Sequence, residues 1–159
     1  MAKPLKTSQM AGKYLTFIVG SEIYGIEILK VQEIIGMMNV TKFPKAPCYV
    51  RGVINLRGNV IPVIELRNKF DMDVTEDTEK TCIIVIQLDK LKEGIIVDEV
   101  REVIDISESN IETPPQFGID EEMNFVKGVG KIDEKVIILL DIDRLISGDS
   151  EIIKGILED

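Results

Sequence analysis

The chain contains an internal repeat, and this repeat constrains its fold more than any other feature. The segment 49–66, Tyr-Val-Arg-Gly-Val-Ile-Asn-Leu-Arg-Gly-Asn-Val-Ile-Pro-Val-Ile-Glu-Leu, returns in weaker form at 125–142. The identical positions are Val50, Gly52, Val53, Val60 and Ile61, which match Val126, Gly128, Val129, Val136 and Ile137. Because each copy of a repeat is usually one structural unit, we expect a protein built from two similar halves.

The repeat extends upstream of these segments. Further matching stretches are 14–17 with 83–86, 25–28 with 94–97, and 31–35 with 100–104. Aligning the halves requires an insertion in the second half between 113 and 124, where Pro114, Pro115 and Gly118 indicate a loop. Several matches in the same order favour a duplication over the alternative, two β-rich stretches that share only composition.

Short apolar segments rich in isoleucine and valine predict an all-β chain. About ten strands in two sets of five favour two small barrels packed together. The segment 29–37 has helical as well as strand-like spacing. We favour a strand with an irregular start there, because its copy in the second half is richer in valine and isoleucine.

The predicted regions are a mobile tail at 1–12, one domain at 13–147 and a C-terminal helical tail at 148–159. Inside the domain, an acidic linker at 71–80 separates a first subdomain, about 13–70, from a second, about 81–147. Exchange of strands between the two subdomains is allowed by this division. The domain therefore consists of two related parts whose strands need not stay in their own half.

Charge and hydropathy exclude several classes of protein. The chain carries 28 Asp and Glu residues against 19 Lys and Arg residues, a formal net charge of −9, and has no Lys and Arg cluster of the kind that binds phosphates. No apolar run reaches the roughly 20 residues of a membrane-spanning helix, and the start lacks the apolar core of a signal peptide. We therefore predict a cytoplasmic protein with no nucleic-acid partner and no direct membrane insertion.

The sequence is poor in catalytic chemistry. It has no histidine, no phosphate-binding glycine loop, and two separate cysteines, Cys48 and Cys82, which we expect to be buried free thiols. Glu65, Asp98 and Asp141 are candidates for a paired acid, but carboxylates at strand ends are usually solvated. We predict no catalytic, cofactor or metal site, and an interaction role becomes the default hypothesis.

Two segments resemble the CheW family of chemotaxis coupling proteins. They are 24–35, Tyr-Gly-Ile-Glu-Ile-Leu-Lys-Val-Gln-Glu-Ile-Ile, and 50–67, whose Asn-Leu-Arg-Gly-x-x-Ile-Pro core is very specific. The resemblance runs from about Lys13 to Ser147. It implies two intertwined five-stranded SH3-like β-barrel subdomains that share a hydrophobic core, with short helical turns, and it implies no cofactor.

The resemblance also implies a function. Members of this family are non-enzymatic adaptors that couple the cytoplasmic tips of methyl-accepting chemotaxis receptors to the regulatory domain of the histidine kinase CheA in two-component signal transduction. The protein is then expected to be a monomer in isolation, to join rings or arrays with its partners, and to reach the inner face of the membrane through the receptors.

Two alternatives remain at this stage. One is a fragment of a CheA-type kinase, namely its regulatory domain; a start at Met1 and an end soon after the last repeat favour the adaptor. The other is a ligand-binding sensor module or small enzyme that uses the seam between the barrels. The lack of histidine and of a phosphate loop counts against this second alternative.

The resemblance assigns receptor binding to Ile28, Val31, Glu33, Gly52, Asn55 and Arg57, and kinase binding to Phe117. Val31 is expected to supply apolar area and Glu33 to orient a receptor cation or amide; the alternative is a core valine and a solvated glutamate. Gly52 is expected to allow a close backbone approach. The planar guanidinium of Arg57 suits either binding of a partner carboxylate or capping of a loop. Phe117 is either an exposed anchor for the kinase or folded onto the core.

Overall fold

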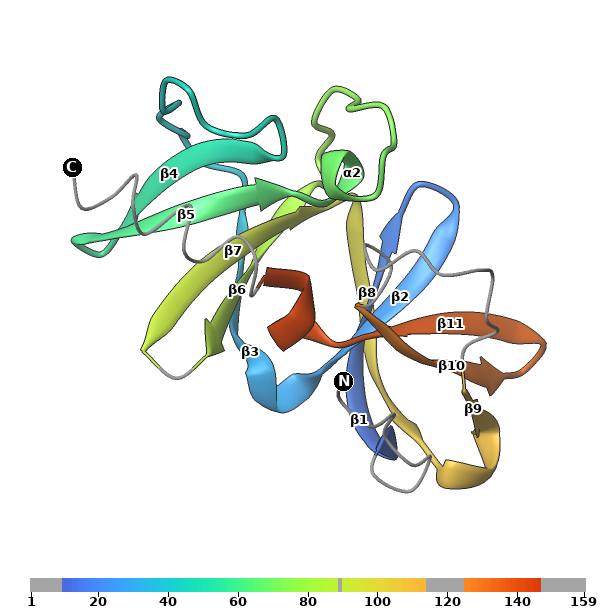
Figure 1. Cartoon of the computed structure of the whole chain (residues 1–159). Helices are drawn as coiled ribbons and strands as arrows, with labels where there is room; N and C mark the ends of the chain where they lie inside the picture. The colour runs from blue at the N-terminus through green and yellow to red at the C-terminus, as the bar shows by residue number, and fades with distance from the viewer. Residues whose placement is uncertain (1–9, 89, 114–124, 147–159) are drawn as a thin grey trace.

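The computed structural model describes residues 10–88, 90–113 and 125–146 (Figure 1). Its strands are β1 Gly12–Val19, β2 Glu22–Glu27, β3 Val31–Gly36, β4 Val50–Leu56, β5 Asn59–Glu65, β6 Cys82–Leu88, β7 Leu91–Val97, β8 Glu99–Ile106, β9 Ile111–Glu112, β10 Val126–Ile132 and β11 Lys135–Leu140. Short helical turns are η1 Ile28–Lys30, α2 Leu66–Lys69, η2 Glu108–Asn110 and residues 142–146. None of the helices in the described residues is long and apolar enough to cross a membrane.

The strands form two sheets that lie side by side in Figure 1. One has the order β8-β1-β2-β11-β10-β9 and the other the order β3-β6-β7-β5-β4, so each sheet mixes strands from both halves of the sequence. The neighbours are antiparallel except for β2 with β11 and β5 with β7, which are parallel. The predicted all-β, intertwined fold is confirmed, although the first sheet has six strands rather than five.

The sequence repeat is reproduced in the strand register. In the parallel pair β5–β7, Val63 lies opposite Gly94, and at the equivalent place in β11–β2, Leu139 lies opposite Gly25. The hairpins also share a hydrogen bond at their open ends: the backbone N–H of Glu65 donates to the Tyr49 carbonyl, and that of Asp141 donates to the Phe125 carbonyl, both at 2.7 Å. The two sheets are therefore copies of one architecture.

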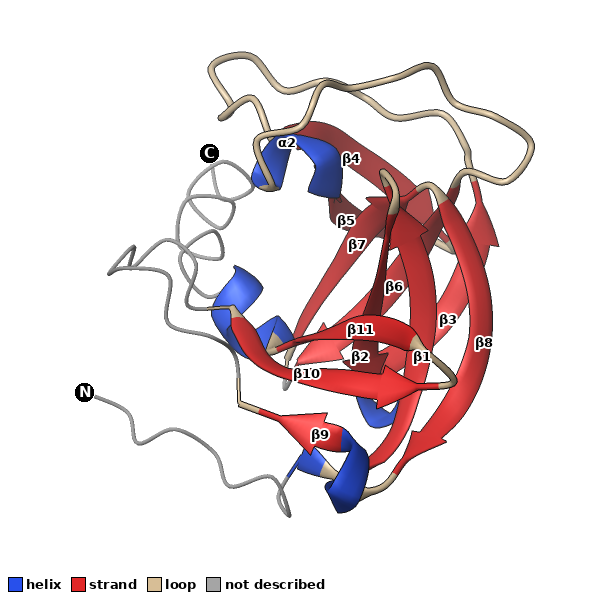
Figure 2. Cartoon of the chain, turned by 90° about the vertical axis from the view of Figure 1, so that its right-hand side faces the viewer, coloured by secondary structure: helices blue, strands red, loops and turns tan. Residues whose placement is uncertain are grey.

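The sixth strand, β9, has a much reduced counterpart in the first half. In Figure 2, β9 lies beside β10 at the edge of its sheet, where Glu112 pairs with Val129. At the equivalent place in the other sheet, the pairing consists of one bridge between Thr41 and Val53. The difference in strand number thus reflects the length of one short edge pairing and leaves the shared architecture unchanged.

The largest hydrophobic cluster lies between the two sheets, and we call it the seam. Both sheets contribute to it, for example Phe17 from β1 and Ile84 from β6. A stack of aromatic rings runs through it, with centroid distances of 6.0, 5.0 and 5.2 Å along the series Phe17, Tyr24, Phe70 and Phe125. Two smaller clusters fill the interiors of the individual barrels. Burial of apolar area in the seam therefore joins the two barrels into one body.

The prediction for the segment after β2 is confirmed, whereas the prediction for the cysteines is partly wrong. The segment after β2 is irregular at η1 and then continues as strand β3, as predicted. The expectation of buried cysteines is wrong for Cys48, which is exposed in the loop between β3 and β4, while Cys82 at the start of β6 is half-buried. Prolines in the loop before β4 interrupt strand pairing, so the loop lies on the surface and exposes its thiol.

Candidate functional site

An ion pair joins the two edges of the five-stranded sheet. Glu33 lies on edge strand β3, and Arg57 lies in the turn after edge strand β4. Arg57 Nη1 donates to Glu33 Oε1 at 2.6 Å, and Nη2 donates to Oε2 at 2.7 Å. These hydrogen bonds hold the pKa of the Glu33 carboxyl below its ordinary value and raise the pKa of Arg57. The curvature of the sheet brings its two edges close enough for this bidentate pair of side chains to bridge them.

The turn that carries Arg57 has an unusual backbone. Arg57 and Gly58 have φ angles of 51° and 86°, which match the turns that join closely paired antiparallel strands. Asn55 Oδ1 accepts a hydrogen bond from the Gly58 backbone N–H at 3.0 Å and so braces the turn from its own strand. Asn55 therefore supports the conformation that aims the Arg57 side chain at Glu33.

Gly52 lies on β4 against the backbone of the preceding loop. Its φ is 150°, and a Cβ atom added there would lie 2.1 Å from the carbonyl oxygen of Thr41. Thr41 and Val53 exchange two backbone hydrogen bonds of 2.9 Å at this point. The predicted close backbone approach at Gly52 is confirmed, and it positions the strand that leads to Arg57.

Ile28 and Val31 are half-buried and pack against the seam. Next to them, Leu29 is 94% exposed, and Ile34 on β3 is 44% exposed. The apolar pattern of the sequence does not predict the exposure of Leu29, because alternation along a strand does not apply at the irregular η1. Ile34 lies on the outward face of the alternating strand β3, although it is apolar. Alignment of the two halves does indicate that Leu29 is exposed, because this leucine matches the charged Asp98 of the second half.

The predicted site residues thus form two groups. Ile28, Val31 and Glu33 come from η1 and β3, whereas Gly52, Asn55 and Arg57 come from β4 and its turn. The Glu33–Arg57 ion pair joins these groups at the surface. Phe117 lies outside the described residues.

A second arginine binds a buried carboxylate on the other side of β4. Arg51 Nη1 donates to Glu65 Oε2 at 3.0 Å, and the Glu65 side chain is only 7% exposed. Burial raises the pKa of Glu65, although the hydrogen bond from Arg51 opposes that effect. The expectation that carboxylates at strand ends are solvated is therefore wrong for Glu65, whose backbone bond to Tyr49 turns this strand end inward.

The equivalent of Arg51 in the second half is Lys127, and its environment differs. The side chain is 6% exposed, with Nζ 2.7 Å from Glu27 Oε1 and 5.0 Å from the centre of the Tyr14 ring. Burial lowers the pKa of Lys127, but its bonds to Glu27 and Tyr14 outweigh burial and leave the pKa above its ordinary value. The two copies share a fold and a positive charge at this position, but the lysine is more deeply buried and has different partners.

A charged network also links the two sheets at one end of the seam. Arg67 Nε donates to Asp98 Oδ1 at 2.9 Å, and Asp98 Oδ2 accepts from the backbone N–H of Gly20 at 2.8 Å. Arg67 follows β5, whereas Gly20 lies between β1 and β2. Asp98 is therefore a structural clamp between the sheets, and the alternative of a paired catalytic acid gains no support from its contacts. Among residues 10–88, 90–113 and 125–146, no group of three or more His, Cys, Asp or Glu side chains is arranged to hold a metal ion.

Comparisons with known proteins agree on one family. The family model for the CheW-like domain matches residues 13–150. The chemotaxis protein CheW of Klebsiella aerogenes is 37% identical over 154 residues, which cover 94% of this chain and 93% of that protein. The chemotaxis protein CheW of Bacillus subtilis is 32% identical, with 94% of each chain covered.

A solved structure supports the same assignment. The chain is similar to the crystal structure of the scaffolding protein TtCheW from Thermoanaerobacter tengcongensis, with a TM-score of 0.78 and 38% identity. The match covers 86% of this chain and 93% of that one. The sequence match over almost the whole domain and the shared fold show that the chain belongs to the CheW family of chemotaxis scaffolding proteins, which are not enzymes.

Proposed function

We propose that this protein is an adaptor that couples the cytoplasmic tips of methyl-accepting chemotaxis receptors to the regulatory domain of the histidine kinase CheA. One observation carries the receptor half of the proposal: the surface ion pair Glu33–Arg57 lies on a barrel that also exposes Leu29 and Ile34. Exposed apolar side chains supply binding area, and a charged pair with remaining hydrogen-bonding capacity supplies orientation.

The comparison between the two halves supports a specific role for this surface. The second half keeps a glutamate at the position of Glu33, namely Glu102, but has Asp133 at the position of Arg57. The ion pair is therefore a property of the first half alone, although the turn backbone is the same in both, with φ of 50° at Asp133. A fold that duplicates its backbone but not its surface is suited to different partners on its two halves.

Each predicted receptor-binding residue has a part in this proposal. Glu33 and Arg57 meet the receptor directly, and Ile28 and Val31 form the half-buried apolar floor beside them. Asn55 and Gly52 act through the backbone that positions Arg57. Phe117 is proposed as the kinase anchor. We propose a monomer in the cytoplasm that joins receptor and kinase arrays at the inner face of the membrane.

Co-sedimentation with receptor-containing membranes tests the proposal. The protein is expected to pellet with membranes that carry a methyl-accepting receptor, and the kinase is expected to pellet efficiently only when the protein is present. Membranes from cells without receptors are the control. If the protein stays in the supernatant with receptor membranes, or if kinase recruitment does not depend on it, the adaptor proposal is wrong.

A further inference from the structure

The loop between α2 and β6 lies on the surface beside the five-stranded sheet, and we call residues 71–81 the strap. Its C-terminal end is organised by its own hydrogen bonds, in which Thr78 and Thr81 take part. Its N-terminal end receives a hydrogen bond from Arg67 Nη1 to the carbonyl of Asp73 at 3.1 Å. Between these ends, Asp77 ties the strap to the barrel.

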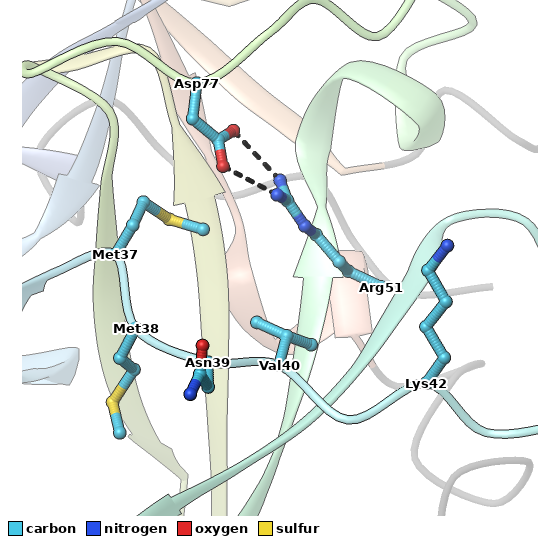
Figure 3. A pocket seen from close by; sticks show the side chains of 7 residues that line it. All are labelled: Met37, Met38, Asn39, Val40, Lys42, Arg51 and Asp77. Atoms are coloured by element: carbon cyan, nitrogen blue, oxygen red, sulfur yellow. Dashed lines mark hydrogen bonds and ion pairs between the residues drawn. The ribbon is translucent and has the colours of Figure 1, made fainter.

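Asp77 binds the barrel through Arg51. Arg51 Nη1 donates to Asp77 Oδ1 at 3.0 Å and Nη2 donates to Oδ2 at 2.6 Å, as the dashed lines in Figure 3 show. On its inner side, Arg51 is fixed by the buried carboxylate of Glu65. The guanidinium is thus held in place by the barrel, whereas the carboxylate on its outer side comes from an exposed loop.

Two hollows open on either side of this ion pair, and Arg51, Asp77 and Lys42 line both of them. The first has a volume of about 400 Å³ and includes Met37, Met38 and Val40 (Figure 3). The second has a volume of about 570 Å³ and includes the apolar side chains of Phe43, Pro47, Val50 and Val74. We call the two hollows together the trough: an arginine at its centre with apolar walls on both sides.

The lining of the trough favours one kind of occupant. Met38 and Val74 are exposed by 37% and 49%, so apolar area on both sides of Arg51 is available for contact. Lys42 and Arg51 bring two positive charges, whereas Glu65 binds Arg51 from the inner side and Glu76 adds a further negative charge to the lining. The lining therefore suits a single carboxylate on the Arg51 guanidinium, where that of Asp77 lies, and a peptide with one carboxylate between apolar side chains matches this arrangement.

We propose that the trough is a docking site for an acidic, apolar segment of a partner protein, whose carboxylate takes the place of Asp77 on Arg51. Asp77 is then an internal substitute for the partner's carboxylate. Because one exposed carboxylate replaces another, Arg51 keeps two carboxylate partners throughout the exchange. The strap competes with the partner, and opening of the strap is coupled to docking. This site lies apart from the Glu33–Arg57 surface and does not depend on the function proposed above.

A matched pair of peptides tests the docking site on the full chain. The probes are acetyl-Met-Leu-Asp-Leu-Met-amide and the same peptide with Asn in place of Asp, titrated into ¹⁵N-labelled protein. The Asp77→Ala variant is expected to bind the Asp peptide at least about fivefold more tightly than the unmodified chain does, because the internal competitor is gone. Shifts are expected at the Arg51 side chain and at Met37–Lys42, and the Asn peptide is expected to bind more weakly.

A second variant tests whether the arginine fork itself recognises the peptide carboxylate. In the Asp77→Ala background, Arg51→Lys is expected to weaken peptide binding while keeping the positive charge and the fold, because lysine lacks the bidentate fork. Equal binding of the Asp and Asn peptides, or equal affinity of the unmodified and Asp77→Ala proteins, overturns the proposal. Concentration-dependent dimerisation of Asp77→Ala that blocks the trough also overturns it and assigns the surface to a second copy of the chain.

Discussion

At the scale of single residues, the proposed receptor surface depends on backbone positions that tolerate little change. Gly52 leaves no space for a side chain, because the carbonyl oxygen of Thr41 occupies the place of its Cβ. Arg57 adopts a left-handed backbone conformation that Asn55 supports with its side chain. The charged pair at the surface is therefore positioned by the contacts that Gly52 and Asn55 make within the fold.

Gly52→Ala is expected to lower the free energy of unfolding by about 3 kcal/mol, because the new methyl group forces β4 away from Thr41. Urea unfolding measures the effect. Gly36→Ala is the control: nothing lies within 4 Å of the added Cβ, so its effect is expected to stay within about 0.5 kcal/mol. Equal stability of the two variants would show that the approach at Gly52 is not tight.

The Glu33–Arg57 pair predicts a defined dependence on pH. Because hydrogen bonds from Arg57 lower the pKa of Glu33 in the folded chain, the stability from this pair is present above the ordinary glutamate pKa of 4.5 and is lost as the pH falls through the folded pKa. The difference in unfolding free energy between the unmodified chain and Arg57→Gln is therefore expected to shrink in acid. Lys135→Gln, at the exposed start of strand β11, serves as the control. A difference that stays constant down to about pH 3 contradicts the shift.

At the scale of elements, the two hairpins β4–β5 and β10–β11 differ in how well their residues suit the same turn. The first places Gly58 at the second left-handed position, whereas the second places Glu134 there with a φ of 66°. Side chains destabilise this conformation by about 1–2 kcal/mol per residue, and glycine does not. The second hairpin therefore carries backbone strain that the first avoids.

Glu134→Gly is accordingly expected to raise the free energy of unfolding by about 1 kcal/mol. Thermal unfolding followed by circular dichroism detects this as an increase in Tm. Asp105→Gly, at an exposed position on strand β8, is expected to lower stability by about 0.5–1 kcal/mol, since glycine weakens a strand interior. A decrease in Tm for both variants would contradict the turn assignment.

The sequence predicts features that depend on neighbouring residues in the chain, and it does not predict contacts between residues that are far apart in the chain. The repeat and the apolar segments predict the strands and their duplication, because both are local patterns. The contact of Glu33 with Arg57 is not predictable in this way, because it depends on how far the five-stranded sheet curves and brings its two edges together. The burial of Glu65 likewise depends on tertiary neighbours rather than on its own segment.

At the scale of the whole molecule, exchange of strands makes the two barrels dependent on each other. The N-terminal strands β1 and β2 pair with β8 and β11, and in return β6 and β7 pair with β3 and β5. The seam then buries apolar side chains from both sheets. Neither half of the sequence can complete a barrel alone.

Division of the chain in the strap tests this dependence. Fragments 1–75 and 76–159 are each expected to be unfolded, because β1, β2, β6 and β7 lose pairing partners. An equimolar mixture is expected to refold, since the break falls in an exposed loop. Heteronuclear NMR spectra measure both states. A dispersed spectrum from either fragment alone contradicts the exchanged topology as the basis of stability.

The proposal that the two halves bind different partners is tested most directly by measuring receptor binding to two variants with the same change at equivalent positions. Glu33→Lys places a lysine beside Arg57, whereas Glu102→Lys makes the same change at the matching position of the second half. In a titration with a receptor-tip fragment, Glu33→Lys is expected to weaken binding by at least about tenfold, and Glu102→Lys by less than about twofold. Equal affinities of the unmodified chain and Glu33→Lys would contradict the proposal that this surface meets the receptor.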